Sequence, residues 1–350
     1  MTFEEIFSID TSNMYRVIKE FPAQVRDAVR LGNSLRFTIS PRGIDVIVLT
    51  GLGGSAIGGD LLRNYLADEL SVPLLVNRHY TLPRFVGKRS LVIVSSYSGN
   101  TEETIAAHKE ALKRGAKMLC ISSDGITERL ARKKRTPLIK IPGGFQPRAA
   151  LGYSFFPLLI ALSRSGFVKS KARAIAETIA LLDAKAAEYA NPDPSTNRAL
   201  QLARQLHGRI GVVYCSGEHL DAINTRWRSQ AAENAKSLVF GHVLPEMNHN
   251  ELVGWKVLEA PMREMMVLFL RDKGDHARVQ TRLELTKSII AEHTPHIVEV
   301  WSEGTSLLAR MFSLVYLGDW VSYYLGILYH EDPTPVKVID YLKSELGKVR

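Results

Sequence analysis

The segment IDVIVLTGLGGSAIGGD, residues 44–60, runs from a stretch of aliphatic residues into a turn rich in glycine and serine. The residues that follow, LLRNYLADEL (61–70), have the spacing of a helix. A strand, a tight turn and a helix in this order are typical of a parallel sheet with crossover helices. The next apolar runs alternate with amphipathic stretches in the same way, and they are VPLLVN (72–77), SLVIVSSYSG (90–99), KMLCISS (117–123) and PLIKIPGG (137–144). This rhythm predicts a parallel sheet in the first part of the chain.

The same rhythm returns in the second part of the chain. RIGVVYCSG (209–217) has the form of the first strand and its turn, and further strands are predicted at EMMVLFLRD (264–272) and HIVEVWSEG (296–304). Between the two parts, residues 151–166 predict a buried helix, and residues 169–208 predict charged connecting helices broken at the sequence NPDP.

The predicted fold class is therefore α/β, with two doubly wound parallel-sheet subdomains and connecting helices. We expect an N-terminal subdomain with a leading helical segment at residues 1–155, connecting helices at 156–205, and a C-terminal subdomain with a C-terminal helix at 206–350. A chain of 350 residues with 45% hydrophobic content is long enough for two domains of ordinary size.

Composition predicts a soluble, cytoplasmic protein. We find no uninterrupted apolar stretch of membrane-spanning length, and the first ten residues, MTFEEIFSID, carry acids where a secretion signal carries bases. Cys120 and Cys215 lie far apart within apolar runs, as buried thiols of a reduced protein do. Neither cysteine has a CxxC partner, so no structural zinc site is predicted.

The net charge of +9 could indicate a nucleic-acid surface. The Lys and Arg residues are scattered, however, and their one short cluster, RLARKKR (129–135), stands at the predicted end of a helix, where basic residues are favoured. We therefore predict neither a nucleic-acid partner nor a membrane partner. A modest excess of positive charge would attract a small anionic substrate.

The glycine turn fits the loose dinucleotide pattern G-x-G-x-x-G/A through Gly51, Gly53 and Ala56. A helix start suits a phosphate because its free N–H groups and its dipole face the anion. A dinucleotide site also needs an acid about twenty residues later for the ribose hydroxyl. The chain offers Asn77 and Arg78 there, which leaves only an NADP variant open. A Walker-type loop is excluded because no Gly-Lys-Ser/Thr follows the glycines.

A second hydroxyl-rich turn, SSYSGNTEET (95–104), follows the third predicted strand and again leads into a helix. Capping of that helix by Asn100 or Thr101 would explain one or two of the hydroxyls in the turn. Two adjacent strand ends of this kind converge on the crevice where open parallel sheets bind ligands. Neutral hydroxyls and backbone N–H groups suit a phosphate monoester that must be held and then released.

Six separate motifs follow one another along nearly the whole chain, and they are GLGGSAIGGD (51–60), SYSGNTEET (96–104), PRAALGYSF (147–155), HLDAINTRWRSQAAENAK (219–236), PEMNHNELVGW (245–255) and IDYLK (339–343). In this order they resemble the sugar isomerase (SIS) proteins, and within them the bifunctional phosphoglucose/phosphomannose isomerases. The two SIS subdomains of that family agree with the repeated rhythm of strands and helices.

The resemblance implies reversible isomerisation of glucose 6-phosphate and mannose 6-phosphate with fructose 6-phosphate, by ring opening and enediolate proton transfer, without a cofactor or a metal. It implies a substrate phosphate anchor made of Gly53, Gly54, Ser55, Ser96, Ser98 and Thr101. It also implies four catalytic side chains, namely Glu233 as the C1/C2 proton carrier, Arg148 as the cation beside the enediolate, and His249 and Lys343 as groups that assist ring opening.

Each implied role has a structural alternative. The hydroxyls could serve turn geometry alone, and Glu233 could be a surface acid paired with Lys236 at the i,i+3 spacing. His242 stands close enough to His249 to be confused with it, and Lys337 is an alternative to the C-terminal lysine of the motif. Thr334 is a candidate for the threonine that sets selectivity in the family.

The resemblance further implies a homodimer with shared active sites, in which His249 crosses the interface. The segment 245–255 has Pro245, Met247 and Trp255 around its polar tip, which suits docking on a partner, whereas the alternative is an internal lid. Two other functions remain open at this stage. One is a non-catalytic sugar-phosphate regulator built on SIS domains, and the other is an NADP oxidoreductase built on Gly51 and Arg78.

Overall fold

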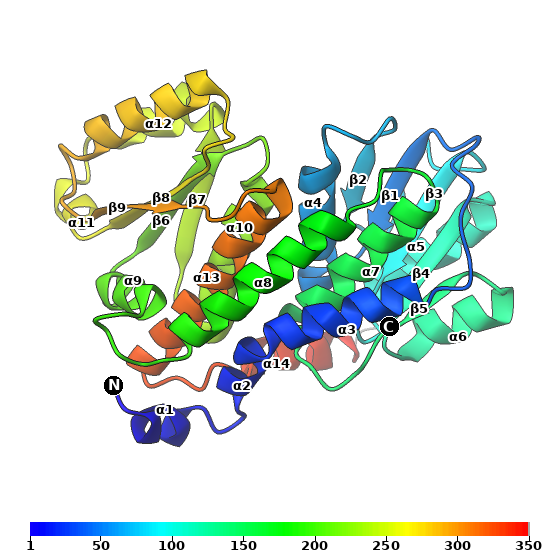
Figure 1. Ribbon diagram of the computed structural model, residues 1–350, viewed down its shortest axis with the longest axis horizontal. Helices are drawn as coiled ribbons and strands as arrows, with labels where there is room; N and C mark the ends of the chain where they lie inside the picture. Colours follow the sequence, from blue (N-terminus) through cyan, green and yellow to red (C-terminus); the bar gives the residue numbers. More distant parts are fainter. Residues whose placement is uncertain (349–350) are drawn as a thin grey trace.

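The structure, a computed structural model, describes residues 1–348. Its first sheet has five parallel strands in the order β2-β1-β3-β4-β5 (Figure 1). The strands are β1 (Val46–Thr50), β2 (Leu74–Asn77), β3 (Ser90–Ser95), β4 (Lys117–Ser122) and β5 (Leu138–Lys140). Every one of them lies in a predicted apolar run. Every residue of β1 and β3 is buried, because a parallel sheet of this kind has helices over both faces.

The second sheet has four parallel strands in the order β7-β6-β8-β9. They are β6 (Gly211–Ser216), β7 (Val239–Leu244), β8 (Met266–Arg271) and β9 (Ile297–Trp301). In both sheets the first strand in the chain lies between the second and the third, so the central topology is the same. The predicted α/β class with two doubly wound parallel sheets is confirmed. The sequence did not predict β7.

Helices of the two halves follow the strands as the rhythm predicts. The first half contains α4 (Gly53–Leu66), α5 (Glu102–Arg114) and α6 (Gly125–Lys134), and the second contains α10 (Asp221–Ala235), α11 (Glu259–Arg263) and α12 (Ala277–Ile290). Short 3-10 turns are η1 (Pro147–Ala149), η2 (Glu246–His249) and η3 (Glu251–Gly254). The basic cluster at 129–135 ends α6, and its last four residues are exposed, as expected for a solvated helix end.

The remaining helices join the halves. The N-terminal ones are α1 (Phe3–Ile9), α2 (Met14–Lys19) and α3 (Phe21–Asn33), and the connecting ones are α7 (Leu151–Arg164), α8 (Ala172–Tyr189) and α9 (Arg198–Leu206). Figure 1 shows α3 and α8 running side by side from one half toward the other, and the two helices are in contact. The buried helix and the break near NPDP are thus where the sequence predicts them.

The helix α13 (Leu307–Leu328) has 22 residues and packs against α8, α9 and α10. Its length and composition would suit a membrane span. Arg310 and Asp319 interrupt its apolar residues, so the expectation that the chain has no uninterrupted apolar stretch of that length holds. Because 94% of its apolar window is buried in the protein, α13 is a core helix.

One hydrophobic core runs through both halves. It contains residues of β1 and β3 as well as residues of β6, β8 and α13. Phe155 of α7 lies 5.0 Å from Phe312 of α13 between ring centroids, across the predicted boundary. The division into 1–155, 156–205 and 206–350 therefore stays a prediction, since the two halves share one hydrophobic core. Cys120 and Cys215 are buried and unpaired, and burial raises the pKa of Cys120 to about 12.

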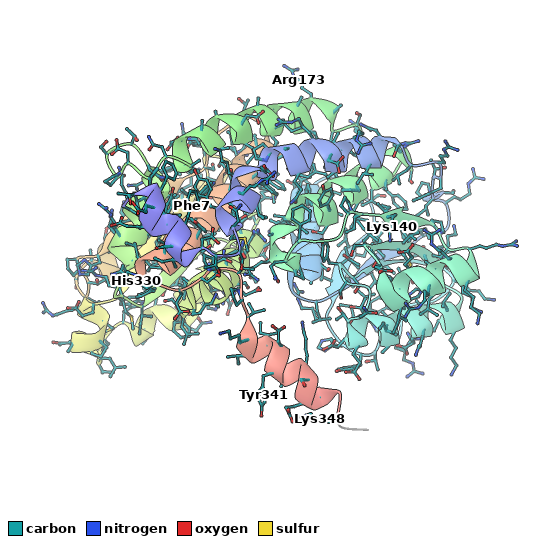
Figure 2. The ribbon with its side chains drawn as sticks, turned by 90° about the horizontal axis from the view of Figure 1, so that it is seen from below. Phe7, Lys140, Arg173, His330, Tyr341 and Lys348 are labelled. Carbon is teal, nitrogen blue, oxygen red and sulfur yellow. The ribbon has the colours of Figure 1, made fainter. Side chains whose placement is uncertain are left out.

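The last helix, α14 (Lys337–Leu346), projects from the body of the molecule (Figure 2). None of its residues is buried, although its spacing is amphipathic. Val338 is 81% exposed and Tyr341 is 68% exposed, so the apolar side of the helix has no cover within residues 1–348.

Candidate active site

The two hydroxyl-rich turns meet at the carboxyl ends of β1 and β3. A Cβ atom on Gly51 would lie 2.7 Å from the carbonyl oxygen of Ser95, so the strand ends approach as closely as two backbones can. Ser55 joins the turns from the first side. Its Oγ accepts a hydrogen bond from the N–H of Tyr97 at 3.0 Å, and its carbonyl accepts one from Ser95 Oγ at 3.3 Å. The two turns therefore lie side by side, as the sequence predicts.

The hydroxyl groups of the second turn do not cap α5. Thr101 occupies the cap position, but its side chain makes no capping hydrogen bond, so the capping alternative is wrong for this residue. Ser96 is buried and donates to Thr101 Oγ1 at 3.3 Å. Ser98 is exposed, and its Oγ accepts from the N–H of Asn100 at 3.3 Å. Ser98 is thus the hydroxyl of this turn most open to a ligand.

A cleft of about 460 Å³, including its open mouth, separates the first turn from α10. Its walls are Gly53, Gly54, Ile57, Arg78, Arg148, Thr225, Arg226, Ser229, Gln230 and Glu233. The helices α4 and α10 face each other across it, and the ion pair between Arg63 and Asp221, 2.6 Å apart, links them. The cleft therefore lies between the two halves of the molecule, at the start of the glycine turn.

Arg148 is a buried charge in the cleft, and its side chain is 3% exposed. Its Nε donates to Asn234 Oδ1 at 2.7 Å, and one Nη donates to Glu233 Oε2 at 3.2 Å. The other Nη donates to the carbonyls of Pro333 at 2.7 Å and Thr334 at 2.9 Å. Burial lowers the pKa of Arg148, the Glu233 carboxylate opposes that effect, and a guanidinium stays charged.

Glu233 points at Arg148 and not at Lys236. The ammonium of Lys236 donates to backbone carbonyls, those of Glu233 at 2.9 Å and Asp332 at 2.8 Å. The alternative of a simple i,i+3 ion pair on a helix surface therefore does not describe Glu233. Its carboxylate stands on the cleft wall beside a buried cation, which is an arrangement that can exchange a proton with a bound substrate.

His249 and Lys343 lie outside this cleft, since neither belongs to its lining among residues 1–348. His249 is exposed at the end of η2, and Lys343 is exposed on the projecting helix α14. Lys337 is exposed at the start of the same helix. His242 has a local role, because its Nδ1 accepts from the N–H of Val243 at 2.7 Å. Of the predicted residues, one chain thus brings Gly53, Gly54, Arg148 and Glu233 to the cleft wall and leaves His249 and Lys343 apart. The four predicted hydroxyl residues lie in the two adjoining turns and do not line the cleft, and they are Ser55, Ser96, Ser98 and Thr101.

Several cleft residues are absent from the sequence prediction. Arg226, Gln230 and Glu233 follow one another at helical spacing on α10, so the position of Glu233 on that helix could have revealed the other two. Arg78, which the sequence offered only for the NADP alternative, also lines the cleft, where it pairs with the buried Asp60. Thr334 lies beside the site through its carbonyl, and its Oγ1 is buried without a hydrogen-bond partner among residues 1–348.

The chain matches the family model described as "Bacterial phospho-glucose isomerase C-terminal SIS domain" over residues 195–346. A hypothetical protein from Thermus thermophilus has the same fold, with a TM-score of 0.75 over 99% of this chain and 94% of that one, at 14% identity. The fold with its paired hydroxyl-rich turns therefore defines an SIS-type protein. At 14% identity, the structural similarity supports the fold and not a function.

Two sequence relatives make the assignment more specific. The bifunctional phosphoglucose/phosphomannose isomerase of Caldicellulosiruptor bescii is 40% identical over 338 residues, which cover 96% of this chain and 100% of that protein. The enzyme of the same name from Aquifex aeolicus is 39% identical, over 86% of this chain and 90% of that protein. The chain belongs to the family of bifunctional phosphoglucose/phosphomannose isomerases. The resemblance seen in the motifs is confirmed, and the regulator and NADP alternatives lose their support.

Proposed function

We propose that this protein interconverts glucose 6-phosphate and mannose 6-phosphate with fructose 6-phosphate. Family membership supports the substrates, and the pairing of Arg148 with Glu233 on the wall of one cleft is the observation that carries the chemistry. Proton transfer between C1 and C2 requires a base within reach of both carbons and a cation for the enediolate oxygen. Glu233 supplies the base and Arg148 supplies the cation.

The phosphate group of the substrate binds at the paired turns in this proposal. Gly53 and Gly54 open α4, whose first N–H groups have no partners within the helix and face an anion favourably. Ser98 and Thr101 add hydroxyls from the neighbouring turn, with Ser55 and Ser96 holding the two turns together. The sugar then extends from the phosphate into the cleft toward α10.

Ring opening needs an acid or base that the cleft of one chain does not contain in this proposal. His249 is exposed, and the segment after it exposes Val253 by 77%, Val257 by 80% and Leu258 by 63%. An imidazole surrounded by exposed apolar side chains suits an interface with a second copy. We therefore propose a homodimer in which His249 completes the active site of the partner subunit, with Lys343 of the projecting helix α14 as a second contributor.

The direct test uses fructose 6-phosphate with purified, EDTA-treated protein and measures both aldose products. We expect glucose 6-phosphate and mannose 6-phosphate to form without added metal. Glu233→Gln should bind substrate but lower turnover by about 10²- to 10⁴-fold, because a positioned base contributes that much. Glu292→Gln, at an exposed acid outside the cleft, is the matched control and should keep full activity. Formation of neither aldose by the native protein would refute the proposal.

A further inference from the structure

A buried carboxylate, that of Asp319, stands in the middle of the predominantly apolar core helix α13. Asp319 is 5% exposed. Its two oxygens accept hydrogen bonds from Arg226 Nε at 3.0 Å and Arg226 Nη2 at 2.8 Å, and Oδ1 also accepts from Gln230 Nε2 at 2.8 Å. A buried charge is costly unless its partner is well placed, so this forked contact fixes both side chains in one geometry.

The contact continues to the backbone of the cleft cation. Arg226 Nη2, which binds Asp319, also donates to the carbonyl oxygen of Arg148 at 3.1 Å. The guanidinium of Arg148 is held from the other end, because its Nε donates to Asn234. Asn234 in turn donates to Ser322 Oγ at 2.9 Å, and Ser322 donates to the carbonyl of Asp319 at 2.8 Å. Two branches therefore run from one turn of α13 to the two ends of Arg148.

The helix that carries these branches also carries the base. Arg226, Gln230 and Asn234 are spaced four residues apart on α10, so they lie along one side of it, and Glu233 stands next to Asn234 on the cleft wall. α10 and α13 approach closely, since a Cβ atom on Gly318 would overlap the Trp227 ring, with Cε2 of that ring 2.6 Å away. The contacts with α13 thus fix the position of α10 near Glu233, where Glu233 accepts a hydrogen bond from Arg148.

We propose that Asp319 is a positioning residue. It fixes the position of Arg148 relative to Glu233, through Arg226 and through the Ser322–Asn234 branch. Asp319 does not line the cleft and does not touch the substrate in this proposal. The inference rests on the proposed isomerase function, because it assigns Asp319 to the same enediolate step. A displacement of about 1 Å at a catalytic group is enough to lower turnover about 10²-fold.

Asp319→Asn is the first variant, because it keeps the shape and one acceptor but removes the charge and the forked contact. We expect kcat with fructose 6-phosphate to fall at least about tenfold while KM changes less than about threefold, since the phosphate anchor is intact. The matched control is Asp272→Asn. Asp272 is equally buried and pairs with Arg310 of the same helix at 2.9 Å, but it has no contact with Arg148 among residues 1–348. It should keep the native kcat.

A double-mutant cycle separates positioning from a general loss of stability. If Asp319 acts through Arg148, Asp319→Asn should lower kcat far less in an Arg148→Ala background than in the native one. Should Asp319→Asn fail to fold, Ser322→Ala decides, because it cuts one branch with a smaller change and should still lower kcat with little effect on KM.

The outcomes can be told apart. A native protein that forms neither aldose overturns the proposed function and this inference with it. An active native protein whose folded Asp319→Asn variant keeps full kcat, or whose loss is fully additive with Arg148→Ala, overturns the positioning role alone. An equal loss in Asp272→Asn would also overturn it, because the effect would then belong to any buried ion pair of α13. A folded Ser322→Ala variant with native kcat counts against it in the same way.

Discussion

Gly54 is the residue at which the first glycine turn meets the backbone of Pro147 and Arg148. A Cβ atom at this position would lie 2.5 Å from the carbonyl carbon of Pro147 and 2.8 Å from the N atom of Arg148. These are backbone atoms, which cannot rotate away as a side chain can. The absence of a side chain at Gly54 is therefore a condition for the start of α4 to pack on η1.

Gly54→Ala should separate the turn from Arg148 and lower kcat/KM about 10²-fold or more, because the two groups would be displaced by about 1 Å. Steady-state isomerase rates would measure this. Gly87→Ala is the comparison, since a Cβ atom there meets nothing within 4 Å and the backbone needs no positive φ. Equal rates for the two variants would show that close packing at Gly54 has no part in activity.

At the level of single residues, the sequence predicts Arg148 and Glu233 as candidates but not the contacts around them. Arg148 and Glu233 were recognised from motifs, and the structure places them 3.2 Å apart. Their link to Asp319 could not be predicted, because it depends on how α10 and α13 cross. An acid in an apolar helix gives no signal of the partner it will meet.

Among the elements, α5 carries a buried titratable group that the site does not use. His108 has no exposed surface, its Nδ1 has no hydrogen-bond partner within residues 1–348, and its Nε2 lies 3.9 Å from Cys120 Sγ. Burial lowers the pKa of His108 from 6.5 to about 4. The imidazole is therefore neutral in the folded protein at pH values where the unfolded chain already binds a proton.

This difference makes stability depend on pH in a defined direction. Above pH 6.5 the neutral, buried His108 does not lower the free energy of unfolding. As the pH falls toward 4, the unfolded chain gains a proton at this residue first, and the free energy of unfolding decreases by about 3 kcal/mol in all. Urea unfolding at pH 7 and pH 4 measures the effect. Between these two pH values, the free energy of unfolding should decrease less in His108→Leu than in the native protein. Burial raises the pKa of Asp275 to about 6, which acts in the opposite direction, but both proteins share that effect.

The control for this measurement is His79→Leu, because His79 is exposed. It should keep the pH dependence of the native protein. A native-like loss of stability in His108→Leu between pH 7 and pH 4 would mean that other groups cause the acid sensitivity.

The sequence was most informative for elements with uniform surroundings. Strands such as β1 and β3 are buried along their length and read as unbroken aliphatic runs. β7 was missed because it is an edge strand, mostly half exposed, with Gly241 and His242 in its middle. Its pairing with β6 is decided by tertiary structure, which overrides weak local preference.

On the scale of the whole molecule, one chain leaves two candidate residues without a site. His249 and Lys343 are both exposed, and α14 has no buried residue. Their positions relative to the cleft could not be predicted from spacing, because in the proposed dimer they depend on a second chain. The projecting helix in Figure 2 and the exposed apolar residues after His249 are consistent with such an assembly.

Mixing two inactive variants tests the shared site. His249→Ala and Glu233→Gln chains, allowed to exchange subunits, should recover part of the native isomerase activity. In a heterodimer, one of the two sites receives an intact His249 and an intact Glu233. Activity is measured in samples whose heterodimer content is established by mass spectrometry. Continued inactivity of a proven heterodimer would refute the shared site and leave the isomerase proposal standing.

The place of α13 in the chain has a consequence for how the protein is made. The helix packs against α8, α9 and α10 in the centre of the molecule, yet it begins at residue 307. A ribosome needs roughly 15 to 60 s to reach that point at about 5–20 residues per second. Until then, the apolar faces that α13 will cover are open to water and to neighbouring nascent chains. We therefore expect a chain that ends before α13 to leave apolar faces of α8, α9 and α10 uncovered and to aggregate during synthesis, which sedimentation of the truncated translation product would measure.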